Sequence, residues 1–357
     1  MKGKIEHVLR LPPGAGNPRN SEGDFLRLAD GRWMLVYTHF YGGDGDYAPA
    51  YLAGRYSADE GATWTDSDVV ILSNEAGMNV MSVSLLRLSS GQAALFYLRK
   101  ESTSDCRPYM RLLRERVPPH KPGAWGPAIP IIPDERAGYY VMNNDRVIQL
   151  DSGRLIAPVA YHRTPTGEPL DPYGVLQCYL SDDEGQTWYA GEPLAPARHK
   201  GHPVMLQEPG VVPLRDGRLM LFSRTDAGCQ YLAYSQDGGV SWTPPRPSAI
   251  RSPLSPASIK RIPTTGDLLL VWNDHTDIPP GLRGLRTPLT LAISRDDGQH
   301  WRRWGHLETN PHGWYCYTAM AFTERHVLLA YTAGDTRKGS GLSTLQLTRV
   351  PLESLYP

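Results

Sequence analysis

The chain has 357 residues, and its 37 Lys and Arg residues equal its 37 Asp and Glu residues, so its formal net charge at pH 7 is zero. No overall electric field therefore draws it to nucleic acid or to an anionic membrane, and any anion must be bound by a local cluster of cations. The four cysteines are scattered without a CxxC pair, so neither a zinc site nor a disulfide framework is expected, although one incidental disulfide stays open.

The N-terminal segment MKGKIEHVLRLPPGAG contains no apolar stretch of signal-peptide length, and no run of 18 apolar residues occurs in the chain. We therefore expect a cytoplasmic protein that does not cross a membrane. A secreted protein whose leader had been removed would have the same N-terminus.

Turns that precede apolar strands recur along the whole chain. LADGRWMLVY, LSSGQAALFY, LDSGRLIAPV, LRDGRLMLFS and TTGDLLLVW each carry a turn glycine, and FTERHVLLAY at 322–331 is a sixth copy without one. A polar-Gly pair between apolar runs indicates a β-hairpin. Since no amphipathic helix separates the copies, residues 1–357 are predicted to form a single all-β domain, a six-bladed β-propeller of four-stranded antiparallel blades. A β-sandwich or several small β-domains are the alternatives.

A second repeat has the pattern S-x-D-x-G-x-[T/S/H]-W and starts at residues 57, 181, 235 and 294. The first interval is about twice the others, as if one copy had decayed, with Trp125 as its remnant. The spacing from the hairpins places the repeat on the turn between the third and fourth strands of a unit. There the Asp would accept backbone N–H groups, the Gly would supply a positive φ and the Trp would be buried. The acids do not match EF-hand spacing, so we interpret the repeat as architecture.

Antiparallel alternation puts these turns at one end of each unit and the candidate site at the other. Counting nine residues back from each hairpin glycine reaches Glu22, Ser82, Asn144, Glu208 and Ala257. Counting forward to the ends of the second strands reaches Thr38 with His39, Arg99, Tyr161 with His162, Arg224, and Asn273 with Asp274. Because so many polar residues are expected at this end of the units, we predict a binding site there. His39 and His162 are expected to face solvent or substrate, because no HxH or HExxH spacing supports a metal.

The hairpins and the Asp-box repeats resemble the sialidase (neuraminidase) superfamily, in its BNR-repeat branch, over nearly the whole chain. The Asp box identifies the fold better than the function. QEPGVVPLRDGRLMLFSR is similar to a sialidase segment, which implies that Glu208 is the general base and that Arg224 binds the substrate carboxylate. RTPLTLAISRDDGQHW implies the same carboxylate-binding role for Arg286, with Arg283 as a near neighbour.

Two further segments complete the resemblance. YCYTAMAFTERHVLLAY implies that Tyr317 is the catalytic tyrosine, with Tyr315 as the alternate. The loop YGGDGDYAPA implies that Asp46 is the acid/base, with Asp44 as second choice. A neutral tyrosine nucleophile avoids the repulsion that a carboxylate nucleophile would meet from the carboxylate of a sialic-acid-type sugar. Such a tyrosine needs a base within hydrogen-bonding reach.

One departure from the family concerns the first arginine of its carboxylate-binding triad. The F-R-I-P motif is replaced by SEGD at residues 21–24, with Ser21 in place of the arginine. Arg19 and Arg146 are the possible substitutes. Glu22 and Asp24 would repel a carboxylate unless they bind sugar hydroxyls or a cation. Together with Asn144 and Asp145 of the NNDR segment, these residues are predicted substrate contacts.

The leading hypothesis is an exo-acting glycoside hydrolase of sialidase type. It would remove a terminal sialic-acid-like acidic sugar from a glycan or glycoconjugate with retention of configuration, through a tyrosine nucleophile, without a cofactor or metal. The alternatives are a glycosidase or polysaccharide lyase for another acidic sugar, and a non-catalytic glycan-binding propeller. The sequence indicates neither the glycosidic linkage nor the oligomeric state.

Overall fold

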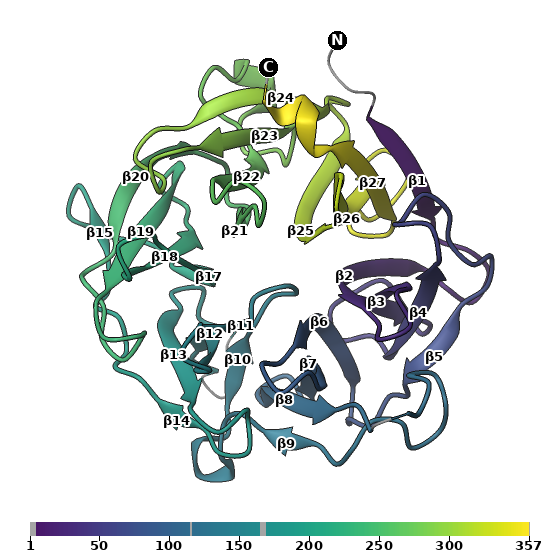
Figure 1. Cartoon of the computed structure of the whole chain (residues 1–357). Coiled ribbons are helices and arrows are strands. Elements are labelled where there is room, and N and C mark those ends of the chain that lie inside the picture. Colours follow the sequence, from purple (N-terminus) through teal and green to yellow (C-terminus); the bar gives the residue numbers. More distant parts are fainter. Residues whose placement is uncertain (1–4, 115, 165–168, 357) are drawn as a thin grey trace.

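The computed structural model describes residues 5–114, 116–164 and 169–356. The only helices in these residues are three short 3-10 helices, η1 (Asp134–Arg136), η2 (Pro280–Leu282) and η3 (Leu352–Leu355). None of the described helices has the length and apolar character needed to cross a membrane. The chain is thus all-β, and its sheets lie around a central axis in a propeller-type arrangement (Figure 1).

Three four-stranded antiparallel sheets follow the chain order from the axis outwards. The first contains β2 (Arg19–Arg27), β3 (Trp33–Phe40), β4 (Ala50–Ser57) and β5 (Val69–Leu72). The second contains β17 (Gln207–Pro213), β18 (Leu219–Arg224), β19 (Cys229–Ser235) and β20 (Arg246–Arg251). The third contains β21 (Ser258–Arg261), β22 (Leu268–Asn273), β23 (Leu289–Ser294) and β24 (Arg302–Glu308). In each sheet the predicted glycine turn connects the first two strands.

A fourth four-stranded sheet combines the two ends of the chain. Its order is β25 (Gly313–Phe322), β26 (His326–Asp335), β27 (Leu345–Pro351) and β1 (Glu6–Leu11). Strand β1 pairs antiparallel with β27, so the N-terminal strand forms the outer edge of the C-terminal sheet. The first and last strands of the chain, β1 and β27, consequently lie side by side in Figure 1.

The repeat predicts two further units with one inner strand each, but the inner strand of one of them is divided into two short pieces. A nine-stranded sheet contains β6 (Asn79–Arg87), β7 (Ala93–Lys100), β8 (Cys106–Leu112), β9 (Ile129–Pro130), β10 (Tyr139–Val141), β11 (Ile148–Gln149), β12 (Leu155–His162), β13 (Val175–Ser181) and β14 (Tyr189–Ala190). Strands β10 and β11 both pair with β12, and residues 142–147 between them form no strand. Strand β10 also makes a parallel contact with β8, which joins the two units. A separate hairpin pairs β15 (Arg198–His199) with β16 (His202–Pro203).

The four S-x-D-x-G-x-x-W repeats form the same hydrogen-bonded turn between the third and fourth strands. In the first copy, Asp59 Oδ1 accepts a hydrogen bond from the Ser57 hydroxyl (2.8 Å) and from the Thr63 amide (2.8 Å). The third copy lies after β19 and repeats this pattern around Asp237. Trp125 lies in the corresponding connection after β8, but its indole bonds to Pro119 O, so the turn there differs.

The strand register places these turns and the candidate site at opposite ends of a sheet. In the first sheet, Trp33 pairs with Ser57 at one end and Phe40 pairs with Ala50 at the other, next to the loop that carries Asp46. Seven steps of about 3.3 Å each separate the two ends by roughly 23 Å. The repeat therefore does not belong to the candidate site.

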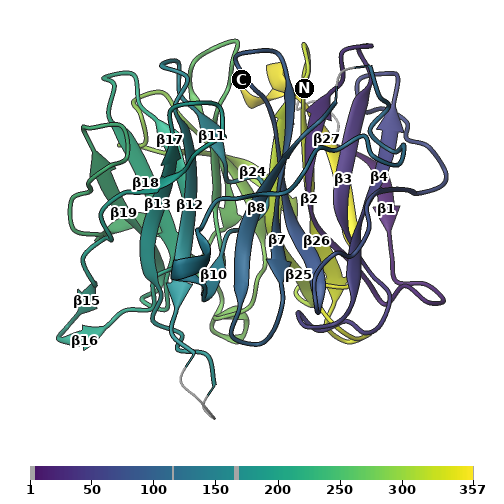
Figure 2. The same ribbon diagram turned by 90° about the horizontal axis from the view of Figure 1, so that it is seen from below.

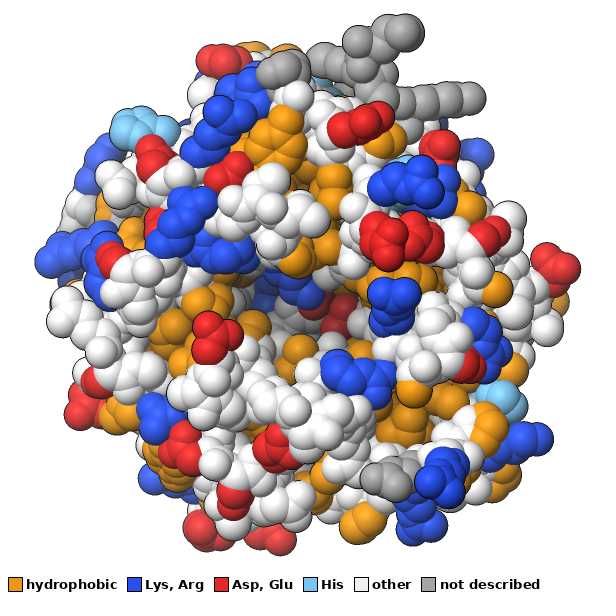
Figure 3. Space-filling model, in the orientation of Figure 1, with side chains coloured by type: hydrophobic (Ala, Val, Ile, Leu, Met, Phe, Trp, Pro, Cys, Tyr) orange, Lys and Arg blue, Asp and Glu red, His pale blue; other side chains and the backbone are white. Residues whose placement is uncertain are grey.

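Neighbouring sheets are held together by apolar side chains. One cluster, for example, combines Leu35 and Tyr37 of β3 with Leu328 and Ala330 of β26, and all four are fully buried. Burial of a large apolar side chain contributes about 1.5–3 kcal/mol, so several such clusters hold neighbouring sheets together. The middle of the face seen in Figure 3 is hollowed, and basic and acidic side chains are visible inside the hollow.

Candidate active site

Bulges in four inner strands direct one side chain each toward the axis. The pairing register shifts in β2, β6, β17 and β25, and at each shift a residue other than glycine has a positive φ. These residues are Glu22 (55°), Ser82 (58°), Glu208 (51°) and Tyr317 (56°). A left-handed conformation costs a non-glycine residue about 1–2 kcal/mol, and bulges are known to re-aim side chains next to functional sites. All four of these side chains line a single cavity.

This cavity has a volume of about 360 Å³. Seven of the residues predicted from the sequence line it: Glu22, Asp46, His162, Glu208, Arg224, Arg286 and Tyr317. Carboxylates, arginines and a phenol thus come together from strands and loops that are up to nearly 300 residues apart in the sequence. Such a concentration of charge in a partly enclosed space indicates a binding or catalytic site.

The Tyr317 hydroxyl donates a hydrogen bond to Oε1 of Glu208 (3.1 Å). Oε2 of the same carboxylate accepts a charge-assisted bond from Nη1 of Arg224 (2.7 Å). Arg224 is fixed from its other side by Gln207 Oε1, which accepts from Nε (3.0 Å) and Nη2 (2.6 Å). Burial and the nearby Glu208 charge raise the pKa of Tyr317, so the phenol is neutral at pH 7. A neutral phenol bonded to a carboxylate is a tyrosine next to its potential base.

Arg286 provides a second cation at the cavity. Its Nη1 donates to the Cys316 thiol (2.9 Å), and its guanidinium lies 5.5 Å from the centroid of the Tyr317 ring. Nε of Arg286 has no hydrogen-bond partner among the described residues. Although burial acts to lower the pKa of Arg286, Cys316, Tyr317 and Glu208 outweigh it and raise that pKa. A charged arginine without a carboxylate partner is suited to binding an anion.

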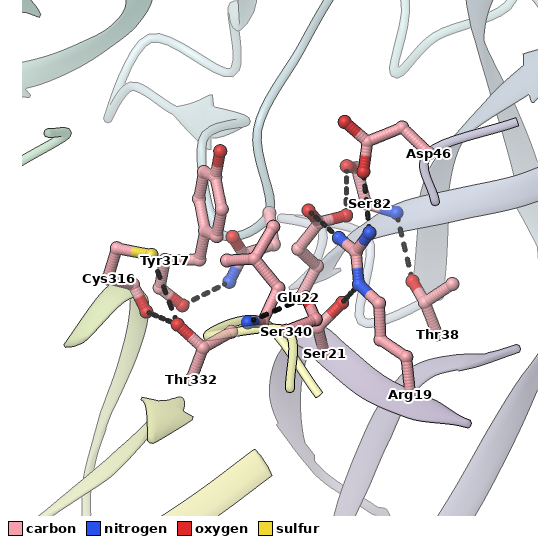
Figure 4. A network of polar contacts seen from close by, with 12 residues as sticks. Arg19, Ser21, Glu22, Thr38, Asp46, Ser82, Cys316, Tyr317, Thr332 and Ser340 are labelled. Carbon is pink, nitrogen blue, oxygen red and sulfur yellow. Dashed lines mark hydrogen bonds and ion pairs between the residues drawn. The ribbon is translucent and has the colours of Figure 1, made fainter. Parts of the chain in front are cut away.

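Asp46 enters the cavity from the loop between β3 and β4, and its side chain is 56% exposed. Its Oδ1 accepts a hydrogen bond from Nη1 of Arg19 (2.6 Å), and its backbone oxygen accepts one from Nζ of Lys100 (2.8 Å). Burial acts to raise the pKa of Asp46, but Arg19 and Lys100 outweigh it and hold the pKa below its usual value. Asp46 is therefore ionised at pH 7. Figure 4 shows its carboxylate and the Tyr317 ring extending to the same side of the polar network.

Arg19 lies behind the cavity wall rather than in it. Its side chain is 1% exposed, and its Nη2 donates to Oε1 of Glu22 (3.2 Å) while Nη1 bonds to Asp46 (Figure 4). Glu22 also accepts a hydrogen bond from the Ser82 hydroxyl (2.9 Å). Burial raises the pKa of Glu22. Arg19 thus neutralises the two acids from behind, and Glu22 rather than Arg19 lines the cavity.

Five further predicted substrate contacts do not reach the cavity, namely Asp24, His39, Asn144, Asp145 and Arg146. Both Asp24 oxygens accept backbone amides, from Phe25 and Leu85. Asp145 and Arg146 bond instead to other inner segments. His39 stacks on Tyr51.

The second-choice residues also lie elsewhere. Asp44 is exposed in its loop, Arg283 is exposed next to η2, and Tyr315 is buried against Tyr331. None of the three lines the cavity, whereas Asp46, Arg286 and Tyr317 do. The structure therefore separates each preferred residue from its alternative.

The sequence-based site lacks several residues that line the cavity, among them Ser82, Lys100 and Gln207. The register count reached Ser82 but gave it no role. Lys100 follows Arg99, the residue that the count selected, but Arg99 bonds to Glu101 outside the cavity. Side chains alternate along a strand, so an error of one residue exchanges the two faces. Gln207 precedes Glu208 and had no signal of its own.

Comparison with known proteins identifies the family of the chain. The family model described as the BNR repeat-like domain matches residues 139–327, more than half of the chain. The chain belongs to the BNR repeat-like domain family. A sialidase of Micromonospora viridifaciens is 36% identical over an alignment of 135 residues, and the match covers 34% of this chain and 18% of that protein. The chain thus matches less than a fifth of the length of that relative.

Solved structures share the fold at low sequence identity. A protein of unknown function from Dyadobacter fermentans has a TM-score of 0.74 and 16% identity, over 97% of this chain and 99% of its own. Trypanosoma rangeli sialidase in complex with 2,3-difluorosialic acid has a TM-score of 0.72 and 15% identity, over 98% of this chain and 59% of its own. NanB sialidase of Streptococcus pneumoniae has a TM-score of 0.71 and 15% identity, over 98% of this chain and 71% of its own. At this identity the likeness establishes the fold alone.

Proposed function

We propose that this protein is an exo-acting glycoside hydrolase of sialidase type, which removes a terminal sialic-acid-like acidic sugar with retention of configuration. The observation that carries the proposal is the hydrogen bond from Tyr317 to Glu208 (3.1 Å) in a cavity that also contains Arg224, Arg286 and Asp46. Sialidases among the similar proteins support it.

In the proposed reaction, Arg224 and Arg286 bind the sugar carboxylate and hold the anomeric carbon near Tyr317. The Tyr317 oxygen attacks that carbon while Glu208 accepts the phenolic proton, so no free tyrosinate is needed. The leaving oxygen takes a proton from Asp46, which must first gain one, since Arg19 lowers its pKa in the free protein. Substrate that displaces water and weakens the contact with Arg19 would raise this pKa. Asp46 then deprotonates the water that attacks the anomeric carbon, and the displaced Tyr317 oxygen takes its proton back from Glu208.

We further propose that the chain forms one domain of six blades. The nine-stranded sheet counts as two blades, joined by the contact between β8 and β10. With the four other large sheets this makes six, which matches the six hairpin turns in the sequence. The pairing of β1 with β27 would close the ring.

The test is hydrolysis of fluorogenic α-sialosides by the wild type and by Tyr317→Phe and Tyr315→Phe. We expect activity in the wild type and in Tyr315→Phe, and a loss of at least about 1000-fold in Tyr317→Phe, since a missing nucleophile removes most of the catalysis. Sialoside hydrolysis that survives Tyr317→Phe would exclude the tyrosine mechanism.

A second candidate is an enzyme for a different acidic sugar, and the position of Glu22 favours it. This carboxylate lines the cavity and is suited to accept hydrogen bonds from a hydroxyl or ammonium group of the substrate. Turnover of other acidic glycosides, but not of sialosides, would support this candidate. An absorbance increase from unsaturated uronates would indicate a lyase, and glycan binding without turnover would indicate a lectin.

A further inference from the structure

Residues 142–147 join β10 to β11 and lie across the inner strands of other sheets. Figure 2 shows β10 and β11 toward opposite ends of the molecule, so this segment runs along the axis between them. The amide of Asp145 donates to Val83 O (2.9 Å) in β6, and its Oδ2 accepts from Met320 N (2.9 Å) in β25. The segment is therefore held by strands on several sides.

Within this segment, one side-chain amide bonds to two bulges at once. Nδ2 of Asn144 donates to Gly23 O (2.8 Å) and to Tyr317 O (3.0 Å). Gly23 lies in the bulge of β2, directly after Glu22, and Tyr317 lies in the bulge of β25. A bulge takes backbone groups out of the strand ladder, and a buried carbonyl without a partner is unfavourable. Asn144 supplies the missing donor to both strands.

The conformations that Asn144 supports are not those that these residues prefer. Glu22 and Tyr317 have φ values of 55° and 56°. Strained backbone of this kind persists only where the surroundings determine it. The next carbonyl of the β25 bulge, Thr318 O, accepts from the Ser258 hydroxyl (2.6 Å), so side-chain donors outside the sheet occupy both bulge carbonyls.

We propose that Asn144 is a positioning residue whose single amide fixes the two bulges that direct Glu22 and Tyr317 into the cavity. Asn144 is buried and does not line the cavity, so it acts through these residues. A shift in the β25 bulge would change the distance between Tyr317 and Glu208, and a shift in the β2 bulge would move Glu22, whereas Arg224 would keep its contacts with Gln207 and Glu208. The kinetic consequence rests on the proposed function, but the structural role does not.

The kinetic test uses Asn144→Ala, which removes both donors and adds no charge. We expect kcat to fall about 100-fold, the typical effect of a displacement near 1 Å at a reacting group, while KM changes less than about threefold. Asn144→Ser keeps a shorter donor and is expected to lose less. Gln230→Ala is the matched control, because Gln230 is a buried amide that also donates two hydrogen bonds (2.8 and 2.9 Å) but does not line the cavity. It should lose stability and keep the wild-type kcat.

A second measurement does not depend on activity. Hydrogen exchange followed by mass spectrometry should show faster exchange in 19–27 and 313–322 of Asn144→Ala, and unchanged exchange in 219–224. If Asn144→Ala does not fold, Asn144→Ser is measured in the same way. A wild type that cleaves no glycoside would contradict the proposed function and leave this test valid. Unchanged exchange in both bulged strands, or a kcat equal to that of Gln230→Ala, would overturn the positioning role.

Discussion

Replacing Glu208 by Gln removes the potential base and keeps the shape of the side chain. In the wild type, the two carboxylate oxygens accept from the Tyr317 hydroxyl (3.1 Å) and from Arg224 Nη1 (2.7 Å). Glutamine has one oxygen and one NH₂ group, and the charge-assisted bond from Arg224 leaves its oxygen on that side. The NH₂ group then faces Tyr317 and cannot take the phenolic proton.

General base catalysis contributes about 10²–10⁴ in rate, which corresponds to about 3–5 kcal/mol in the activation free energy. We therefore expect kcat of Glu208→Gln to fall by at least about 100-fold. Arg224 keeps both bonds to Gln207 Oε1, so it stays in place, and KM should change less than about tenfold.

The assay is steady-state hydrolysis of the best fluorogenic substrate, with unfolding midpoints to show that each variant is folded. Glu192→Gln is the control, because it removes the same charge from an exposed residue that does not line the cavity. A kcat for Glu208→Gln within threefold of the wild type would refute the assignment of Glu208 as the base.

Three other substitutions distinguish the residues that line the cavity from a residue that only stabilises the fold. Arg286→Lys should raise KM about tenfold, because lysine cannot form the bidentate pair with a carboxylate; an unchanged KM for acidic substrates would contradict anion binding here. Asp59→Ala should lower the free energy of unfolding in urea by about 1–2 kcal/mol through the lost turn bonds and leave kcat unchanged, whereas a tenfold loss of kcat would contradict a purely structural repeat. Glu22→Gln tests the raised pKa of Glu22: this carboxyl binds its proton more tightly when folded, so its contribution to stability is fully present below the unfolded pKa and is lost as pH rises through the folded pKa. The unfolding free energy of the wild type minus that of Glu22→Gln should therefore increase as pH falls from 8 to 4, and the opposite trend would contradict the burial argument.

Local patterns predicted the turns of this fold, because both turn types depend on residues that are close in sequence. The hairpin glycines and the S-x-D-x-G-x-x-W turns lie where the spacing places them, at the end of the sheets away from Asp46. The same counting reached Glu22 and Glu208. It succeeded because the distance along a regular strand is a constant rise per residue.

The remaining site could not be read from these patterns, because it depends on irregular backbone and on contacts across the ring. No rule of strand alternation indicates that Tyr317 has a left-handed φ at a bulge. Residues 142–147 form no strand, so the register count does not apply to them. Asn144, expected at the cavity surface, instead bonds to the carbonyl of Tyr317, 173 positions away in the sequence. The sequence makes Arg19 a candidate carboxylate ligand, but its guanidinium forms ion pairs with Glu22 and Asp46. Only the fold brings these groups together.

The central claim is that Tyr317 forms a covalent bond to the sugar, and rapid acid quenching during turnover followed by peptide mass spectrometry tests it directly. Cleavage after Arg303 and Arg325 releases the peptide 304–325, which contains Tyr315 and Tyr317 and no other tyrosine. The mechanism predicts a mass increase equal to the bound sugar on this peptide, located on Tyr317 by fragmentation and absent from Tyr317→Phe. Full turnover in the wild type with the adduct on Glu208 or Asp46, or on Tyr315, would contradict it.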